Sequence, residues 1–301
     1  MKIQDEIEQW KKKRHAVILA HYYTRPEIQQ LADYVGDSLY LSKIAASLTE
    51  QTLVFCGVQF MGESAKLLCP NKTILMPDTQ ASCPMAHMCT KEIIAQVRRE
   101  NTDVAVVCYI NSTAELKSYA DVCVTSSHAY QVVNALPQKN IFFIPDKNLG
   151  HYLAEKMPQK HFIFNKGFCP IHEHISVSSL LELKEKYPSA LVLSHPECRS
   201  EVLAISDFVG STSQIIQHAK EVEASAFIVC TEIGVSYALQ QEIPGKQFYF
   251  PSPEPICHDM KRITPSQVLS VLKTAQNAVM MSEEQMKQAR PSLDRMIELS
   301  K

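Results

Sequence analysis

Short apolar runs alternate with helical patterns along the whole chain. Runs such as AVILA, VAVVCYI and ALVL, which begin at residues 16, 104 and 190, have the length of buried strands. Further apolar runs follow at 52–58 and 72–78, and a helical pattern at 38–48 separates them from the first run. Strands that alternate with helices are typical of βαβ units, which form a mainly parallel sheet covered on both faces.

This pattern occurs three times in one register. In each copy a Glu stands six residues before an Asp: Glu27 and Asp33, Glu115 and Asp121, Glu201 and Asp207. Successive Asp residues lie 88 and 86 residues apart, and the cysteines at 83, 169 and 257 lie 86 and 88 residues apart. Because two kinds of landmark share one period, we favour repeated domains over a chance likeness among βα units. We predict an α/β protein of three homologous αβα domains with mainly parallel sheets around a pseudo-three-fold axis.

The repeat also predicts the domain boundaries. A chain of 301 residues with 46% hydrophobic residues is longer than one compact domain usually needs. We place an N-terminal helix at 1–14, repeat domains at 15–101, 102–188 and 189–275, and a C-terminal helical tail at 276–301.

Charge and hydropathy exclude several classes of protein. The formal net charge is −2 with both signs interspersed, so no basic face for nucleic acid is expected. No run of about 18 apolar residues occurs, and the charged segment MKIQDEIEQWKKKRHA lacks the apolar core of a signal peptide. We therefore expect a cytoplasmic protein without a membrane partner, whose ten cysteines are free thiols or metal ligands.

Seven of the ten cysteines fall into two groups. Four lie inside apolar strand patterns, where cysteine commonly packs as a small hydrophobe: Cys56, Cys108, Cys123 and Cys230. Three lie in polar stretches that contain proline and recur with the repeat: Cys83, Cys169 and Cys257. If the three domains surround one axis, these three thiolates converge.

Zinc sites usually draw on close pairs such as C-x-x-C, whereas single soft thiolates suit an iron–sulfur cluster better. Three ligands on a four-iron cluster leave one iron open as a Lewis acid.

Polar residues recur where the first strand of each repeat ends. His21, Tyr109 and His195 lie twelve residues before the repeat Asp, and Tyr23, Asn111 and Glu197 lie two residues further on. Ligands bind beyond the carboxyl ends of strands in open α/β sheets, so these side chains predict a shared site for proton transfer.

The turns after each Asp carry hydroxyl groups at the expected start of the next helix. These residues are Ser38, Ser126, Ser211 and Thr212. Hydroxyls and free N–H groups at helix N-termini bind anions, which favours ligands with carboxylate or phosphate groups. Neither G-x-G-x-x-G nor G-x-x-x-x-G-K-[ST] occurs, so the repeats are not expected to bind nucleotides.

Many separate motifs resemble one known family. The stretches ILAHYY, ADYVGDSL, GVQFMGE, CPMA, YINSTAE, PDKNLG, GFCPIH, SHPEC, VGSTSQ, TEIG and C-x-x-MK are similar, from end to end, to quinolinate synthases. The resemblance implies a three-domain pseudo-symmetric fold and a [4Fe–4S] cluster on Cys83, Cys169 and Cys257. It also implies a substrate-site role for His172, which the repeat does not select, and for His21, Tyr23, Ser38, Tyr109, Asn111, Ser126, His195, Glu197, Ser211 and Thr212.

The resemblance further implies a reaction. Quinolinate synthases condense iminoaspartate with dihydroxyacetone phosphate to give quinolinate, phosphate and two waters in NAD biosynthesis. A transient L-aspartate oxidase or dehydrogenase would supply the iminoaspartate. Relatives often carry Asn where Tyr22 and Asp259 stand here, and both positions flank functional residues. Longer relatives carry extra cysteines beside the third ligand. This chain lacks them, so no thiol–disulfide switch is expected at Cys257.

We assign Tyr23 and Glu197 as the leading acid/base groups, assisted by His21 and His195. Two rival hypotheses stay open at this point. One is a zinc or mononuclear-iron lyase that uses the same cysteines with His172 or His258. The other is a non-catalytic repeat scaffold, which predicts no metal and no need for polar strand ends.

Overall fold

The computed structural model describes residues 2–300 and contains, within them, three four-stranded parallel sheets. The first sheet consists of β1 (Ala16–His21), β2 (Tyr34–Gly36), β3 (Thr52–Cys56) and β4 (Thr73–Leu75). The second consists of β5 (Val104–Tyr109), β6 (Val122–Val124), β7 (Asn140–Ile144) and β8 (His161–Phe164), and the third of β9 (Leu191–Ser194), β10 (Phe208–Val209), β11 (Ala226–Cys230) and β12 (Gln247–Tyr249). We call the lobes built on these sheets the first, second and third domain.

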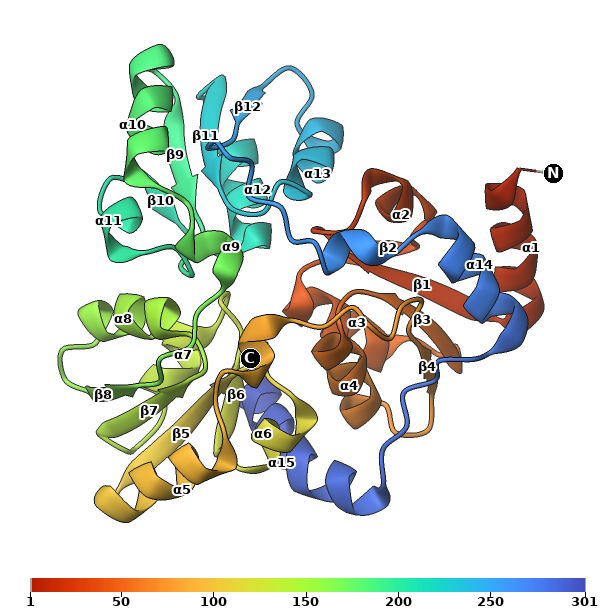
Figure 1. The fold of residues 1–301 in the computed structure, drawn as a ribbon, viewed down its shortest axis with the longest axis horizontal. Coiled ribbons are helices and arrows are strands. Elements are labelled where there is room, and N and C mark those ends of the chain that lie inside the picture. Colours follow the sequence, from red (N-terminus) through yellow and green to blue (C-terminus); the bar gives the residue numbers. More distant parts are fainter. Residues whose placement is uncertain (1, 301) are drawn as a thin grey trace.

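All three sheets have the same strand order. The orders are β2-β1-β3-β4, β6-β5-β7-β8 and β10-β9-β11-β12, with every pairing parallel. Figure 1 shows the three domains arranged around a common centre. The α/β fold class with three parallel αβα domains is therefore confirmed.

A short edge strand, which the apolar pattern did not predict, follows each repeat Asp. The strands β2, β6 and β10 contain only two or three residues, too few for a periodic signal. The Asp side chain before each strand accepts a hydrogen bond from the first strand: Asp33 from Ile18 N (2.8 Å), Asp121 from Val106 N (2.7 Å) and Asp207 from Val192 N (2.7 Å). The repeat Asp thus fixes the return of the chain to the sheet.

Helices cover both faces of each sheet. The first domain contains α2 (Pro26–Leu31), α3 (Ser38–Ser47) and α4 (Gln59–Leu68). Their counterparts are α6 (Ala114–Ser118), α7 (Ala129–Asn134) and α8 (Lys147–Lys156) in the second domain, and α11 (Ser200–Leu203), α12 (Thr212–Glu221) and α13 (Val235–Glu242) in the third. The strands between these layers are nearly continuous apolar runs, and every residue of β1 and β5 is buried.

The helix that follows each cysteine segment packs on the next domain. Helix α5 (Lys91–Glu100) contacts β5, α10 (Val177–Lys186) contacts β11, and α14 (Pro265–Thr274) contacts β3. Each cysteine segment therefore connects two domains. The boundaries after residues 101, 188 and 275 stay a prediction, since these helices precede them in sequence but lie on the following sheet.

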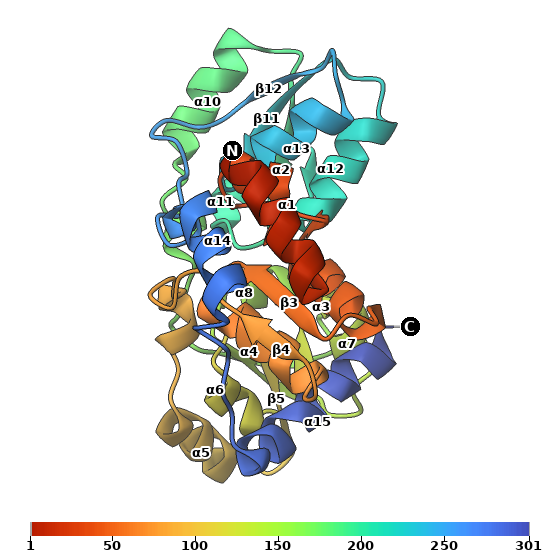
Figure 2. The same cartoon turned by 90° about the vertical axis from the view of Figure 1, so that its right-hand side faces the viewer.

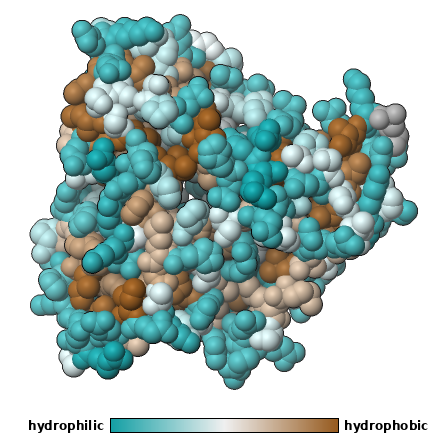
Figure 3. Space-filling model, viewed as in Figure 1, coloured by the Kyte–Doolittle hydropathy of each residue, from teal (hydrophilic) through white to brown (hydrophobic). Residues whose placement is uncertain are grey.

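The two terminal helices close the outside of the molecule. Helix α1 (Ile3–Arg14) packs against α14, and Figure 2 shows both on the flank of the first domain. Helix α15 (Glu283–Leu299) covers α6 and β6 of the second domain. Hydrophilic side chains cover much of the face in Figure 3. Among residues 2–300, no helix has both the length and the apolar character needed to cross a membrane.

Candidate active site

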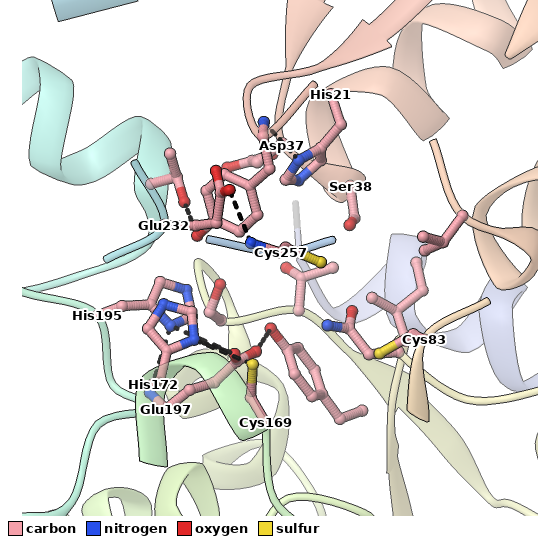
Figure 4. A pocket seen from close by; sticks show the side chains of 18 of the residues that line it. His21, Asp37, Ser38, Cys83, Cys169, His172, His195, Glu197, Glu232 and Cys257 are labelled. Atoms are coloured by element: carbon pink, nitrogen blue, oxygen red, sulfur yellow. Dashed lines mark hydrogen bonds and ion pairs between the residues drawn. The ribbon is translucent and has the colours of Figure 1, made fainter. Parts of the chain in front are cut away.

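A cavity lies where the carboxyl ends of the three sheets meet. Fourteen side chains were selected from the sequence, and all of them except Ser211 line this cavity. The thirteen are His21, Tyr23, Ser38, Cys83, Tyr109, Asn111, Ser126, Cys169, His172, His195, Glu197, Thr212 and Cys257. In Figure 4 the three cysteine sulfurs face the same space from three segments. The chain thus brings together groups from all three repeats.

Each of the three cysteines precedes a short helical turn, directly for Cys83 and Cys169 and three residues ahead for Cys257. Cys83 precedes η1 (Pro84–His87) and Cys169 precedes α9 (Pro170–Glu173), with φ/ψ of −79°/118° and −77°/116°. Cys257 precedes η2 (Met260–Arg262). Burial raises the pKa of Cys83 to about 12 and that of Cys257 to about 11, and it raises the pKa of Cys169 well above its usual value. These groups therefore stay protonated thiols until a metal ion displaces the proton.

Two histidines occupy equivalent positions and share one hydrogen-bond arrangement. His21 Nδ1 accepts from the Tyr23 N–H at 3.1 Å, and His195 Nδ1 accepts from the Glu197 N–H at 3.3 Å. This geometry places the proton of each neutral ring on Nε2. Burial lowers the pKa of His21 to about 4 and that of His195 to about 3, so both rings are neutral N–H donors near pH 7.

The Glu197 carboxylate is buried between the second and third domains. It lies 2.8 Å from His172 Nδ1 and accepts a 2.6 Å hydrogen bond from the Tyr109 hydroxyl. Burial alone would raise the pKa of Glu197, but the neighbouring His195 and the hydrogen bonds from His172 and Tyr109 lower it. Glu197 is therefore held in place as an anion near neutral pH, where it can accept a proton but has none to donate.

The Tyr23 hydroxyl joins the first domain to the third. It lies 2.7 Å from Thr212 Oγ1 and 2.8 Å from Thr231 Oγ1. His172 Nε2 contacts the same Thr231 hydroxyl at 2.9 Å. Burial, and then the nearby Glu197 charge, raise the pKa of Tyr23 well above its usual value, so the phenol keeps its proton near neutral pH.

Two buried polar atoms in this cavity have no partner among the described residues. The Asn111 Oδ1 and Thr125 Oγ1 atoms are both in this state. A buried polar atom without a hydrogen bond is costly, so these groups indicate a polar ligand. Ser211 lies outside the lining, and its hydroxyl caps α12 by accepting from Gln214 N at 3.3 Å. Its predicted binding role stays a prediction.

One group in the cavity could also hold a single metal ion. Donor atoms of Cys169, His172 and Glu197 all lie within 4.8 Å of one another. His172 Nδ1 is 3.2 Å from the Cys169 sulfur. His258, the other histidine considered from the sequence, is exposed and is not part of the cavity lining.

The sequence analysis missed several lining residues. These are mainly Asp37, Thr125, Ser127, Glu232 and Met260. Three of them lie in motifs that were quoted above without a role for the residue: Asp37 in ADYVGDSL, Glu232 in TEIG and Met260 in C-x-x-MK. Asp37 caps α3 through Tyr40 N at 3.0 Å and accepts from the Ser127 hydroxyl at 3.4 Å, so it links the first and second domains.

The chain is similar to known proteins over nearly its whole length. The family model described as "Quinolinate synthetase A protein" matches residues 5–298. A quinolinate synthase from Clostridioides difficile (strain 630) is 47% identical, covering 98% of this chain and 97% of its own. The quinolinate synthase from Aquifex aeolicus (strain VF5) is 43% identical, covering 99% of this chain and 94% of its own. Since the likeness extends over nearly the whole of each protein, this chain belongs to the quinolinate synthetase A family of enzymes.

Proposed function

We propose that this cytoplasmic enzyme condenses iminoaspartate with dihydroxyacetone phosphate to form quinolinate in NAD biosynthesis. The observation that carries the proposal is the convergence of three cysteines on a cavity lined with neutral histidines, hydroxyls and one carboxylate. Both substrates are small and polar, which agrees with the unpartnered Asn111 and Thr125 atoms. An L-aspartate oxidase or dehydrogenase would deliver the unstable imine by transient contact.

The donor set of the cavity fits an iron–sulfur cluster. Cys83, Cys169 and Cys257 each contribute one soft thiol from a separate segment, and these three residues would hold a [4Fe–4S] cluster. When bound, the cluster would supply a Lewis-acidic iron without a protein ligand, able to polarise a substrate oxygen. Because three cysteines would bind three of the four irons, the fourth iron would stay open for the substrate.

The remaining residues bind substrate and move protons. The Nε2–H groups of His21 and His195 can donate hydrogen bonds to substrate oxygens, because their Nδ1 atoms are already occupied. Tyr23 and Glu197 are the acid/base candidates for imine closure and dehydration. Ser38, Ser126 and Thr212, with the Asn111 amide, would hold the carboxylate and phosphate groups.

Iron and sulfide analysis and activity assays of anaerobically purified protein test the proposal. Iron and sulfide should each approach four per chain, and the protein should form quinolinate from the two substrates. Mössbauer spectra of iron-57 protein should show one distinct iron that changes when quinolinate binds. Four irons that do not respond to any ligand would contradict the Lewis-acid role, even if the cluster were present.

The Cys169, His172 and Glu197 group favours one alternative, a mononuclear metal lyase. That enzyme would hold a single zinc or iron ion without sulfide. It would also tolerate loss of Cys83, which is not part of that group. Metal and sulfide analysis of the Cys83→Ala protein therefore separates the two functions.

A further inference from the structure

Two family motifs meet beside the cavity through Glu232 and Lys261, two residues to which the proposed chemistry gives no role. The TEIG motif follows β11, and the C-x-x-MK motif begins at Cys257. Lys261 of the second motif lies 2.8 Å and 3.1 Å from the two carboxylate oxygens of Glu232 in the first. The Glu232 side chain is fully buried, and that of Lys261 is 18% exposed. A buried carboxylate needs such a partner, so this ion pair is an integral part of the junction.

Glu232 fixes the segment that carries the third cysteine. Its Oε1 atom accepts from the Cys257 N–H at 3.0 Å, and its Oε2 atom accepts from the Gly234 N–H at 2.7 Å. Both oxygens are therefore held by main-chain donors as well as by Lys261. The carboxylate sets where the backbone of Cys257 lies relative to β11.

Lys261 extends the same junction into the first domain. Its Nζ atom donates to the Tyr23 carbonyl at 2.6 Å, in addition to pairing with Glu232. The Gln29 amide supports this turn by donating to the carbonyls of Tyr22 at 2.8 Å and Gly234 at 3.0 Å. The main chain at Tyr23 is thus tied to the third domain by side chains other than its own.

The close fit at Gly234 shows how little space the junction leaves. A Cβ atom at this position would lie 2.6 Å from Lys261 Nζ, 2.7 Å from Glu232 Oε2 and 2.8 Å from the Tyr22 carbonyl. The two main-chain segments and the ion pair therefore approach one another as closely as glycine allows.

The other repeats lack the complete arrangement. In the second repeat Asp146 takes the position of Glu232, and its Oδ2 atom accepts from the Cys169 N–H at 3.1 Å. Glu173 stands where Lys261 would be and pairs instead with Lys147 at 2.7 Å. In the first repeat the position of Glu232 holds Val58. The carboxylate that accepts the Cys169 N–H thus forms no ion pair with a lysine among the described residues, so binding this N–H does not by itself require a residue such as Lys261.

We infer that the Glu232–Lys261 ion pair is a positioning pair that couples the Cys257 segment to the main chain of Tyr23. The position of the acid/base phenol then depends on the segment that presents the third cysteine. This positioning role does not require either residue to touch the substrate. The inference rests on the proposed function for the part Tyr23 plays in catalysis, but the physical coupling can be measured without it.

Hydrogen exchange tests the coupling directly. In Lys261→Met, peptides covering 21–25 and 257–261 should both exchange at least about fivefold faster than in the unmodified protein. Lys147→Met is the matched control, because it removes a comparable ion pair beside the second cysteine segment without a bond to Tyr23. The control should leave both peptides unchanged. Faster exchange confined to 257–261 would overturn the inference.

Kinetics test whether Lys261 acts through Tyr23. Lys261→Met should retain its iron and sulfide, lower kcat by about tenfold or more with little change in KM, and recover in part as Lys261→Arg. The Tyr23→Phe/Lys261→Met double variant should be no slower than Tyr23→Phe alone. A double variant whose loss of kcat equals the product of the two single losses would overturn the inference.

If Lys261→Met does not fold, the Glu232→Gln/Lys261→Met variant removes both charges and takes the place of Lys261→Met in each comparison. A wild-type protein that made no quinolinate would contradict the proposed function and leave the exchange test valid.

Discussion

The Tyr109 phenol donates a 2.6 Å hydrogen bond to the Glu197 carboxylate across the boundary between the second and third domains. Both side chains are buried, with 4% and 3% of their surface exposed. Burial, and then the Glu197 charge, raise the pKa of Tyr109 well above its usual value, so the phenol remains the donor. Two repeats thereby combine to hold one anion in place.

The first prediction concerns this anion. Glu197→Gln replaces a proton acceptor with an amide of the same shape and should lower kcat by about 100-fold or more, the usual contribution of a general acid or base. Iron, sulfide and substrate binding should be retained, because the three cysteines are unchanged. Steady-state assays of quinolinate formation measure the effect. Tyr109→Phe, which removes only the hydrogen bond, should cost less, and a near-normal kcat in Glu197→Gln would refute the assignment.

The second prediction concerns the cysteines. Replacing Cys83, Cys169 or Cys257 by alanine should abolish the cluster and activity, as measured by iron and sulfide content. Cys230→Ala is the control, since Cys230 is fully buried at the end of β11 and does not line the candidate active site. It should destabilise the protein by about 1 kcal/mol through a small cavity and leave cluster content intact. A Cys83→Ala protein with full iron and sulfide would rule out the three-cysteine site.

The repeat made most of the fold and cavity predictable from the sequence. Equivalent positions in homologous domains must lie in equivalent places around the axis, so three cysteines and six strand-end residues could be placed together without any contact information. One further repeated feature, a lysine before the fourth strand, was not used to predict the repeat. Each fourth strand is preceded by a lysine that donates to helix-end carbonyls, for example Lys72 to Ala45 at 2.8 Å and Lys246 to Ala219 at 2.8 Å.

Contacts that break the pseudo-symmetry could not be predicted in this way. Tyr23 and Glu197 occupy the same repeat position, yet Tyr23 contacts two threonines whereas Glu197 contacts His172 and Tyr109. Which neighbours a side chain meets depends on how the domains pack, and no local pattern carries that information.

The third prediction compares the structural roles of the repeat Asp and the repeat Glu. Asp207 accepts the Val192 N–H at 2.7 Å, whereas Glu201 is exposed on α11. Asp207→Ala should leave a strand N–H without its acceptor and lower the free energy of unfolding by about 1–3 kcal/mol. Glu201→Ala should change it by less than about 0.5 kcal/mol. Urea unfolding followed by circular dichroism measures both. Equal effects in the two variants would contradict a structural role specific to the Asp.

The last prediction is a loss of stability in mild acid that originates at His21. Burial lowers the pKa of this imidazole to about 4 in the folded protein, while the unfolded chain should have a value of about 6.5. Below that value the unfolded chain binds a proton that the folded protein excludes, so stability falls as the pH drops from about 6.5 toward about 4. Between pH 7.5 and pH 5 this group should account for about 2 kcal/mol of the lost free energy of unfolding. His21→Asn should remove that part of the loss when both proteins are unfolded in urea at the two pH values. Equal losses with and without the imidazole would mean that His21 is charged in the folded protein, and its assignment as a neutral Nε2–H donor would be wrong.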